Sequence, residues 1–289
     1  MGELDLHPAA FTVDLEEWYH AELVRRHASA GELESRAGAA TAPILDLLDR
    51  HGVRATFFVV GDLLRGSPEL IGRLVKSGHE IGCHTFTHRT LWDMSPEDFR
   101  NELREFKAAL AEVAPGVAVR GFRAPTFSVD RRTAWMFRVL EEEGFTYDSS
   151  VVPARGPLYG CPGAPPGIYR PSREDFLRDD PHGPLVEFPA PVVTFAGGRL
   201  PVAGGFYLRM LPFALYRRLV RGVLRKRAFF LYIHPWETDA GTPRLPLPRL
   251  ARWATYRGMA GMLRKVERLL REIPFTTMRE AIEAAGFRV

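Results

Sequence analysis

The sequence contains little cysteine and no long apolar run. Its 289 residues include only two cysteines, Cys83 and Cys161, which excludes a framework of several disulfides and a four-cysteine zinc site and is compatible with a reducing compartment. No stretch approaches the roughly 18 consecutive apolar residues that a membrane-spanning helix requires. Residues 1–10 contain acidic side chains and lack the apolar segment of a signal peptide. These absences predict a cytoplasmic protein without a membrane span.

The sequence also lacks a large block of one charge sign. Its net charge is +4 and its isoelectric point is near 9.2, but most basic residues alternate with acidic ones, which is typical of a solvated surface rich in arginine. No aromatic residues are interleaved with a basic stripe, so we expect no nucleic-acid partner. The densest basic group lies on an expected helix and could face an anionic polymer or make peripheral contact with a membrane; it comprises Arg217, Arg218, Arg221, Arg225, Lys226 and Arg227.

Short apolar runs alternate with longer segments of helical period, a pattern typical of repeated β–α units around a parallel sheet. Expected strands cover residues 11–14, 55–60, 80–84, 121–124, 185–188 and 228–234, and expected helices cover residues 41–51, 62–77, 96–113 and 130–144. Residues 151–205 are rich in proline and glycine and predict irregular loops over one end of the sheet. The sequence therefore predicts one α/β domain over residues 1–289, a distorted (β/α) barrel of about seven parallel strands.

Polar side chains suited to metal binding or proton transfer follow several of these strands. Parallel barrels carry their chemistry at the carboxyl ends of the strands, so these side chains should converge. They are Asp14, Glu16 and Glu17 after the first strand, His84 and His88 after the third, Arg123 after the fourth, and His234 after the last.

Two pairs in this set have the spacing of metal ligands. His84 and His88 would share one face if their segment turned into a helix, although a pair of surface or capped histidines is the alternative. Asp14 and Glu16 point to the same side of an extended segment, although a solvated acidic turn has the same spacing. Two histidines, one carboxylate and a water would complete an open catalytic zinc site.

Arg123 and His234 each have a structural and a functional interpretation. An arginine that enters an apolar strand end needs a buried anion, for which Asp14 is the candidate, unless the side chain extends to solvent. His234 ends an apolar run at the expected barrel mouth, where it would act as a general acid and base or be a satisfied core histidine.

Taken in order, these segments resemble motifs of the polysaccharide deacetylases of the fourth carbohydrate-esterase family. Residues 12–18 resemble a variant of its first aspartate motif, and residues 84–88 resemble its histidine pair. Residues 123–125 resemble its arginine–x–proline motif, residues 147–150 a further aspartate motif without the usual tryptophan, and residues 231–234 its closing leucine–x–histidine element with one residue inserted. Segments 203–209 and 234–237 resemble a subgroup associated with bacterial exopolysaccharide loci and the exosortase system.

The resemblance implies a metal-dependent hydrolase that removes N-acetyl groups from the amino sugars of a polysaccharide or oligosaccharide. Glu16, His84 and His88 would hold the divalent ion, expected to be zinc; alternation favours Glu16 and gives Glu17 a supporting role. Asp14 would be the base, Arg123 would orient it, and His234 would be the acid, with a backbone N–H near Thr126 facing the oxyanion. The alternatives are hydrolysis of another C–N bond, in a cyclic amide or a formylated lipid-linked sugar, and a catalytically inactive carbohydrate-binding protein.

Overall fold

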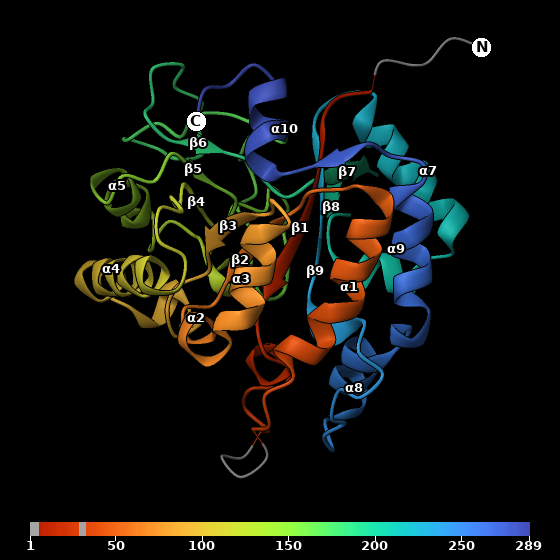
Figure 1. Ribbon diagram of the computed structural model, residues 1–289. Helices are drawn as coiled ribbons and strands as arrows, with labels where there is room; N and C mark the ends of the chain where they lie inside the picture. The colour runs from red at the N-terminus through yellow and green to blue at the C-terminus, as the bar shows by residue number, and fades with distance from the viewer. Residues whose placement is uncertain (1–5, 29–32) are drawn as a thin grey trace.

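A curled parallel β-sheet forms the centre of the protein in the computed structural model, which describes residues 6–28 and 33–289 (Figure 1). Neighbouring strands follow the order β10, β1, β2, β3, β4, β5 and β6, and β9 pairs with the other edge of β1. The strands are β1 (Ala9–Leu15), β2 (Thr56–Val59), β3 (Glu80–Cys83), β4 (Gly121–Phe122), β5 (Tyr147–Asp148), β6 (Val186–Glu187), β9 (Phe229–Ile233) and β10 (Phe275–Thr276). Every pairing among these strands is parallel, so the prediction of a distorted (β/α) barrel is confirmed.

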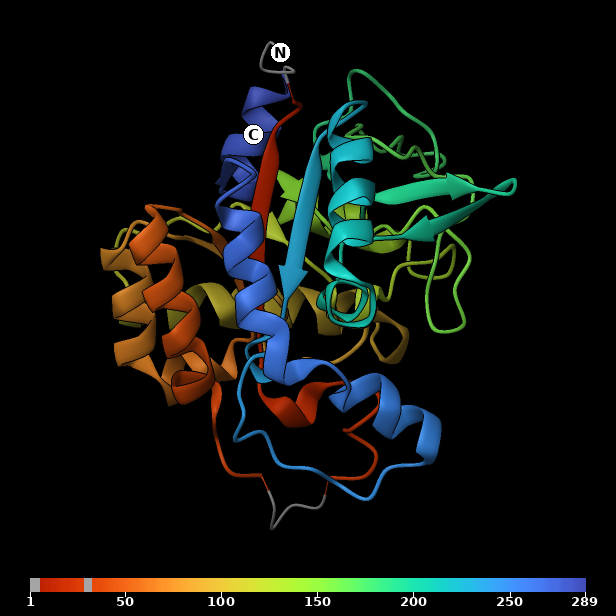
Figure 2. The same ribbon diagram turned by 90° about the vertical axis from the view of Figure 1, so that its right-hand side faces the viewer.

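Helices surround the sheet (Figures 1 and 2). They are α1 (Ala37–His51), α2 (Asp62–Gly66), α3 (Pro68–Lys76), α4 (Pro96–Val113), α5 (Trp135–Glu142), α6 (Gly205–Met210), α7 (Phe213–Leu224), α8 (Arg249–Tyr256), α9 (Met262–Leu270) and α10 (Met278–Ala284). All residues of β1 are buried, because helices or loops cover both faces of a parallel sheet. None of the helices within the described residues is both long and apolar enough to cross a bilayer.

Two of the expected helices differ from the structure. The helix expected over residues 62–77 is two helices, α2 and α3, because Pro68 cannot continue a helix and Ser67 before it adopts φ −147°. The helix expected from Asp130 begins only at Trp135. The Asp130 carboxylate instead accepts a hydrogen bond from the Arg132 N–H in the preceding turn.

Residues 151–205 are mostly irregular, as expected, but they contain β6 and an antiparallel hairpin that was not expected from the sequence. The hairpin joins β7 (Val192–Phe195) to β8 (Gly198–Pro201). Its turn residues Ala196 and Gly197 both have positive φ, 47° and 76°, as a tight two-residue hairpin turn requires. Strands from both halves of the chain share the central sheet, and a single domain over residues 1–289 stays our interpretation.

Candidate active site

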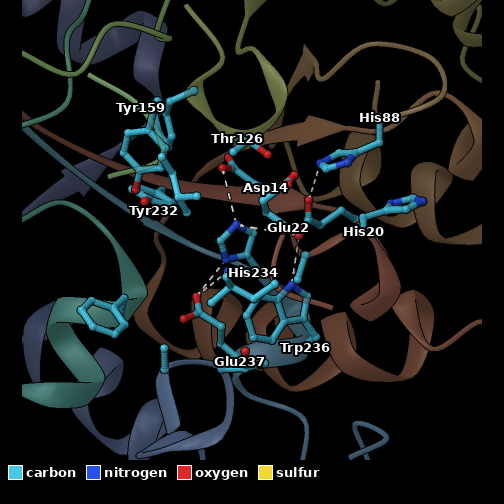
Figure 3. A pocket seen from close by; sticks show the side chains of 18 of the residues that line it. Asp14, His20, Glu22, His88, Thr126, Tyr159, Tyr232, His234, Trp236 and Glu237 are labelled. Carbon is cyan, nitrogen blue, oxygen red and sulfur yellow. Dashed lines mark hydrogen bonds and ion pairs between the residues drawn. The ribbon is translucent and has the colours of Figure 1, made fainter. Parts of the chain in front are cut away.

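Five of the seven expected polar residues meet at one pocket at the carboxyl ends of β1, β3 and β9 (Figure 3), and Glu17 and Arg123 do not line it. Asp14, Glu16, His84, His88 and His234 all line it. A parallel sheet brings these strand ends to one edge, which is why residues far apart in the sequence become neighbours.

Glu16, His84 and His88 can hold a metal ion. One ligand atom from each lies within 4.8 Å of the other two, and all three side chains are buried. The Nδ1 of His84 lies 2.7 Å from the Arg123 carbonyl oxygen. Since a carbonyl only accepts, Nδ1 carries the hydrogen and Nε2 keeps a free lone pair, the arrangement typical of a histidine that binds metal.

The contact between His88 and Glu16 tests whether these residues fit a cation. Glu16 Oε2 lies 2.6 Å from His88 Nε2, yet among the described residues His88 Nε2 has no hydrogen-bond partner of acceptable geometry. A cation bound to both atoms would satisfy them. The donor set of two imidazoles and one carboxylate matches an open catalytic zinc site.

The segment from His84 to His88 does not form a helix, the condition under which spacing alone would align the two histidines. Thr85 and His88 both have φ 59°, which places them in the left-handed region. The buried Glu102 of α4 holds this turn, since its carboxylate accepts hydrogen bonds from the N–H groups of Phe86 (2.7 Å) and Thr87 (2.8 Å). Glu102 was not expected from the sequence, although a glutamate three residues after Phe99 on the apolar face of this helix was a signal.

The two adjacent glutamates have different surroundings. Glu16 Oε1 accepts a hydrogen bond from the Trp236 indole N–H at 3.0 Å, which fixes the carboxylate beside the histidines. Glu17 points away and accepts hydrogen bonds from the N–H groups of Arg36 (2.9 Å) and Ala37 (3.2 Å) at the start of α1. Burial opposes ionisation of Glu16, but the neighbouring His88 and His234 charges lower its pKa well below the usual range.

Arg123 is fully buried and pairs with Asp14. Its Nη1 lies 2.5 Å from Asp14 Oδ1 and also donates to Thr12 Oγ1 at 2.9 Å. The guanidinium lies between two rings, 4.2 Å from the Phe58 centroid and 4.7 Å from the Phe230 centroid. These contacts hold the Asp14 carboxylate in one orientation and exclude an arginine that extends to solvent.

His234 lies beside Asp14 (Figure 3) and close to Glu16. Its Nε2 lies 4.0 Å from Asp14 Oδ2 and 3.9 Å from Glu16 Oε1, while its Nδ1 lies 3.1 Å from Glu237 Oε2. Burial lowers the pKa of His234, but Glu16, Glu237 and Asp14 outweigh burial and raise it to about 9. The raised pKa favours the charged form of the imidazole, and Nε2 is the ring nitrogen near the two acids.

A buried ion pair next to His234 joins segment 203–209 to segment 234–237. Arg209 Nε lies 2.9 Å from Glu237 Oε1, and each side chain is only 2% exposed. A Cβ on Gly205 would lie 2.2 Å from Glu237 Oε2, so only glycine leaves room for this carboxylate. Both segments were expected by resemblance, but Glu237 and Arg209 were not expected as partners of His234.

His20 and Thr126 complete the polar wall of the pocket. The His20 ring stacks on the His88 ring with centroids 4.8 Å apart and planes inclined by 7°, and burial together with the His88 charge lowers its pKa to about 3. His20 was not expected from the sequence. Thr126 has φ 57°, and the role of a backbone N–H near it stays a prediction.

The fold and the pocket define a (β/α)-barrel protein with an acidic and histidine-rich site that can hold a metal. Comparison with family models is more specific: residues 33–147 match the polysaccharide deacetylase family, and residues 149–283 match a domain of unknown function, DUF3473. Residues 33–147 are thus similar to polysaccharide deacetylases, the family that the ordered motifs resemble. A chitooligosaccharide deacetylase of Bradyrhizobium sp. (strain ANU 289) is 40% identical over 85 residues, which are 29% of this chain and 39% of that protein.

Solved structures support the fold. A candidate polysaccharide deacetylase from Mycobacterium smegmatis aligns with a TM-score of 0.65 at 21% identity over 99% of this chain and 92% of its own. A pseudoenzyme of carbohydrate esterase family 4 from Bacillus anthracis also aligns, with a TM-score of 0.51 at 12% identity. The alignment covers 97% of this chain and 67% of the pseudoenzyme. These similarities extend to the fold alone, so catalysis has to be inferred from the site itself.

Proposed function

We propose that this protein is a metal-dependent hydrolase that removes N-acetyl groups from the amino sugars of a polysaccharide or oligosaccharide. One observation carries the proposal: a set of three metal ligands shares one pocket with the Asp14 carboxylate and the His234 imidazole, whose Oδ2 and Nε2 atoms are 4.0 Å apart. The similarity to a chitooligosaccharide deacetylase over 85 residues supports the substrate class. The resemblance of residues 203–209 and 234–237 to one subgroup favours a sugar of bacterial exopolysaccharide synthesis.

Glu16, His84 and His88 would hold the ion, and their two imidazoles and one carboxylate favour zinc. When bound, the ion polarises the acyl carbonyl and increases the acidity of the attacking water. Asp14 takes the proton from that water through Oδ2, since Oδ1 is occupied by Arg123. Arg123 holds the Asp14 carboxylate in place because its guanidinium is an opposite charge in direct contact.

His234 completes the reaction as the general acid. Water oxygen adds to the acyl carbon, the C–N bond then breaks, and the Nε2 proton of His234 passes to the departing nitrogen. The products are acetate and a free amino sugar. Glu237 keeps the other ring nitrogen, Nδ1, bound to a carboxylate, which fixes the ring orientation and stabilises its charge.

A panel of substrates tests the proposed reaction against the other C–N hydrolases. Purified protein supplied with zinc is incubated with an N-acetylated chitooligosaccharide, a cyclic amide and a formylated amino sugar, and acetate, ring-opened product and formate are measured. We expect acetate from the first compound alone, with Asp14→Asn as the inactive control. Ring opening or formate release without acetate would assign the site to another bond.

An inactive carbohydrate-binding protein is the second candidate, since the fold also occurs in a pseudoenzyme. The described site argues against it, because the metal ligands, the base and the acid are all present and face one pocket. Retention of sugar binding by a protein that contains metal but releases no acetate would favour this candidate.

A further inference from the structure

An apolar patch borders the mouth of the pocket. Leu23, Leu158 and Phe206 line the pocket and are 37%, 48% and 36% exposed. The Phe206 ring contacts Trp253 of α8 at 6.4 Å between centroids. Leu250, one helical turn before Trp253 and on the same face, is 76% exposed, so the patch extends from the pocket along α8.

Basic side chains lie next to this patch on α8. Arg249, Arg252 and Arg257 are exposed on or directly after α8. From residue 240 to residue 266 the sequence contains no aspartate or glutamate. Glu22, which lines the pocket, pairs with Arg25 and Arg26, and Asp239 pairs with Arg36. The mouth of the pocket therefore combines exposed apolar side chains with an excess of positive charge.

This combination fits an anionic lipid bilayer better than it fits a sugar chain. A sugar stacks on an exposed aromatic face, whereas here Phe206 and Trp253 pack edge to face at 72°, and the remaining side chains are leucines. Leucine and tryptophan enter the interface of a bilayer, and nearby arginines bind its anionic headgroups. Figures 1 and 2 show α8 at the same end of the molecule as the segment that follows β1, so the pocket would open toward the lipid.

We propose that the surface formed by Leu23, Leu158, Phe206, Leu250, Trp253, Arg249 and Arg252 docks the protein on an anionic phospholipid bilayer. Docking places the pocket at the headgroup level, where the sugar of an amphiphilic, lipid-linked substrate would lie. The choice of such a substrate rests on the proposed function, but binding to the bilayer does not. The two are therefore separable by experiment.

Sedimentation with vesicles tests the docking surface directly. Wild-type protein is mixed with vesicles of phosphatidylcholine alone or of equal parts phosphatidylcholine and phosphatidylglycerol. We expect binding to the mixed vesicles only, weakened by salt. Arg249→Glu combined with Arg252→Glu, and separately Leu250→Glu, should each reduce the binding constant by about tenfold or more.

Matched variants on other faces are the controls. Arg218→Glu combined with Arg225→Glu changes the net charge equally at α7, and Phe195→Glu changes a 71% exposed side chain on the β7–β8 hairpin. We expect both controls to bind as the wild type does, and all variants to keep the wild-type melting temperature. Equal losses in the α7 and α8 variants, or no binding to either vesicle, would overturn the proposal. A higher KM for a soluble chitooligosaccharide in Trp253→Ala, with vesicle binding intact, would instead identify a sugar subsite.

Discussion

Glu16 and Glu17 are adjacent in sequence but belong to different parts of the structure. Glu16 faces the two histidines, whereas the Glu17 carboxylate caps the first turn of α1. We expect Glu16→Ala to lose bound metal and activity. Glu17→Ala should keep the metal but lower stability by about 1 kcal/mol, the usual effect of a lost helix cap. Elemental analysis and thermal melting separate the two, and metal loss in Glu17→Ala alone would transfer the ligand role.

His234 has the position of an acid that binds no metal itself. Its Nε2 lies between Asp14 and Glu16, and Glu237 occupies Nδ1. His234→Ala should therefore retain the metal while turnover falls by about a hundredfold or more. Wild-type turnover should fall on the alkaline side as the imidazolium, whose pKa is raised, loses its proton, and His234→Ala should lack that limb. Loss of the metal in His234→Ala would make His234 a ligand.

Glu237 is a positioning residue, and a double-mutant cycle tests whether it acts through His234. Glu237→Gln keeps the shape of the side chain but removes the charge that holds Nδ1–H, so we expect kcat to fall by about tenfold or more with KM little changed. In a His234→Ala background the same substitution should have almost no effect on kcat. Equal effects in both backgrounds would show that Glu237 serves only the packing against Gly205 and Arg209.

At the scale of elements, β5 and β6 are joined by two buried acids as well as by backbone hydrogen bonds. Asp148 and Glu187 are direct partners across these strands, and both are 0% exposed. Burial raises the pKa of each, and the proximity of Asp148 raises the pKa of Glu187 further. One shared proton would satisfy Asp148 Oδ2 and Glu187 Oε2, which otherwise have no hydrogen-bond partner within the described residues.

This pair predicts how stability depends on pH. The folded state binds the shared proton more tightly than the unfolded state, so its contribution is complete below the unfolded pKa and is lost as the pH rises through the raised values. A folded pKa one pH unit above the unfolded pKa contributes about 1.4 kcal/mol to the free energy of unfolding. Each kcal/mol changes the melting temperature by roughly 2–4 °C. Glu187→Gln should melt with a weaker pH dependence than the wild type, while the exposed Glu69→Gln should not differ from it. The same dependence of melting temperature on pH in all three proteins would contradict a shared proton.

The long, capped helix α4 could be predicted from the sequence, whereas two-residue strands could be predicted only where they lie in a longer apolar run, as β4 and β6 do. α4 matches its expected range because Ser95 and Asp98 form a capping box and its apolar residues recur at helical spacing. β5 and β10 have two residues each, too few to show alternation. The break at Ser67–Pro68 was visible as a proline, but the apolar spacing on both sides favoured one continuous helix.

The site was predictable where chemistry follows a strand and less so where it depends on tertiary contacts. Asp14, His84, His88 and His234 follow strands, so their meeting at one barrel edge could be expected. Local helical spacing did not bring His84 and His88 together; the turn that Glu102 holds did so. Glu237 and Arg209 lie 28 positions apart, and no spacing rule relates two such residues.

At the scale of the whole molecule, the site draws on distant parts of the chain. Asp14 and Glu16 precede both matched segments, residues 33–147 supply His84, His88 and Arg123, and residues 149–283 supply His234 with its partners Glu237 and Arg209. The segment matched to a domain of unknown function thus contributes β9, the residue proposed as the acid, and α8. Neither segment alone contains the complete pocket.

The central claim is that acetate release depends on a metal held by Glu16, His84 and His88. The most direct test measures acetate release from an N-acetylated chitooligosaccharide together with the metal content of the same sample, before chelation, after chelation and after zinc is restored. We predict about one metal per chain, loss of activity with the metal, and recovery of both on restoration, with no recovery in His88→Ala. Full activity after complete metal removal, or restored metal without acetate release, would contradict this claim.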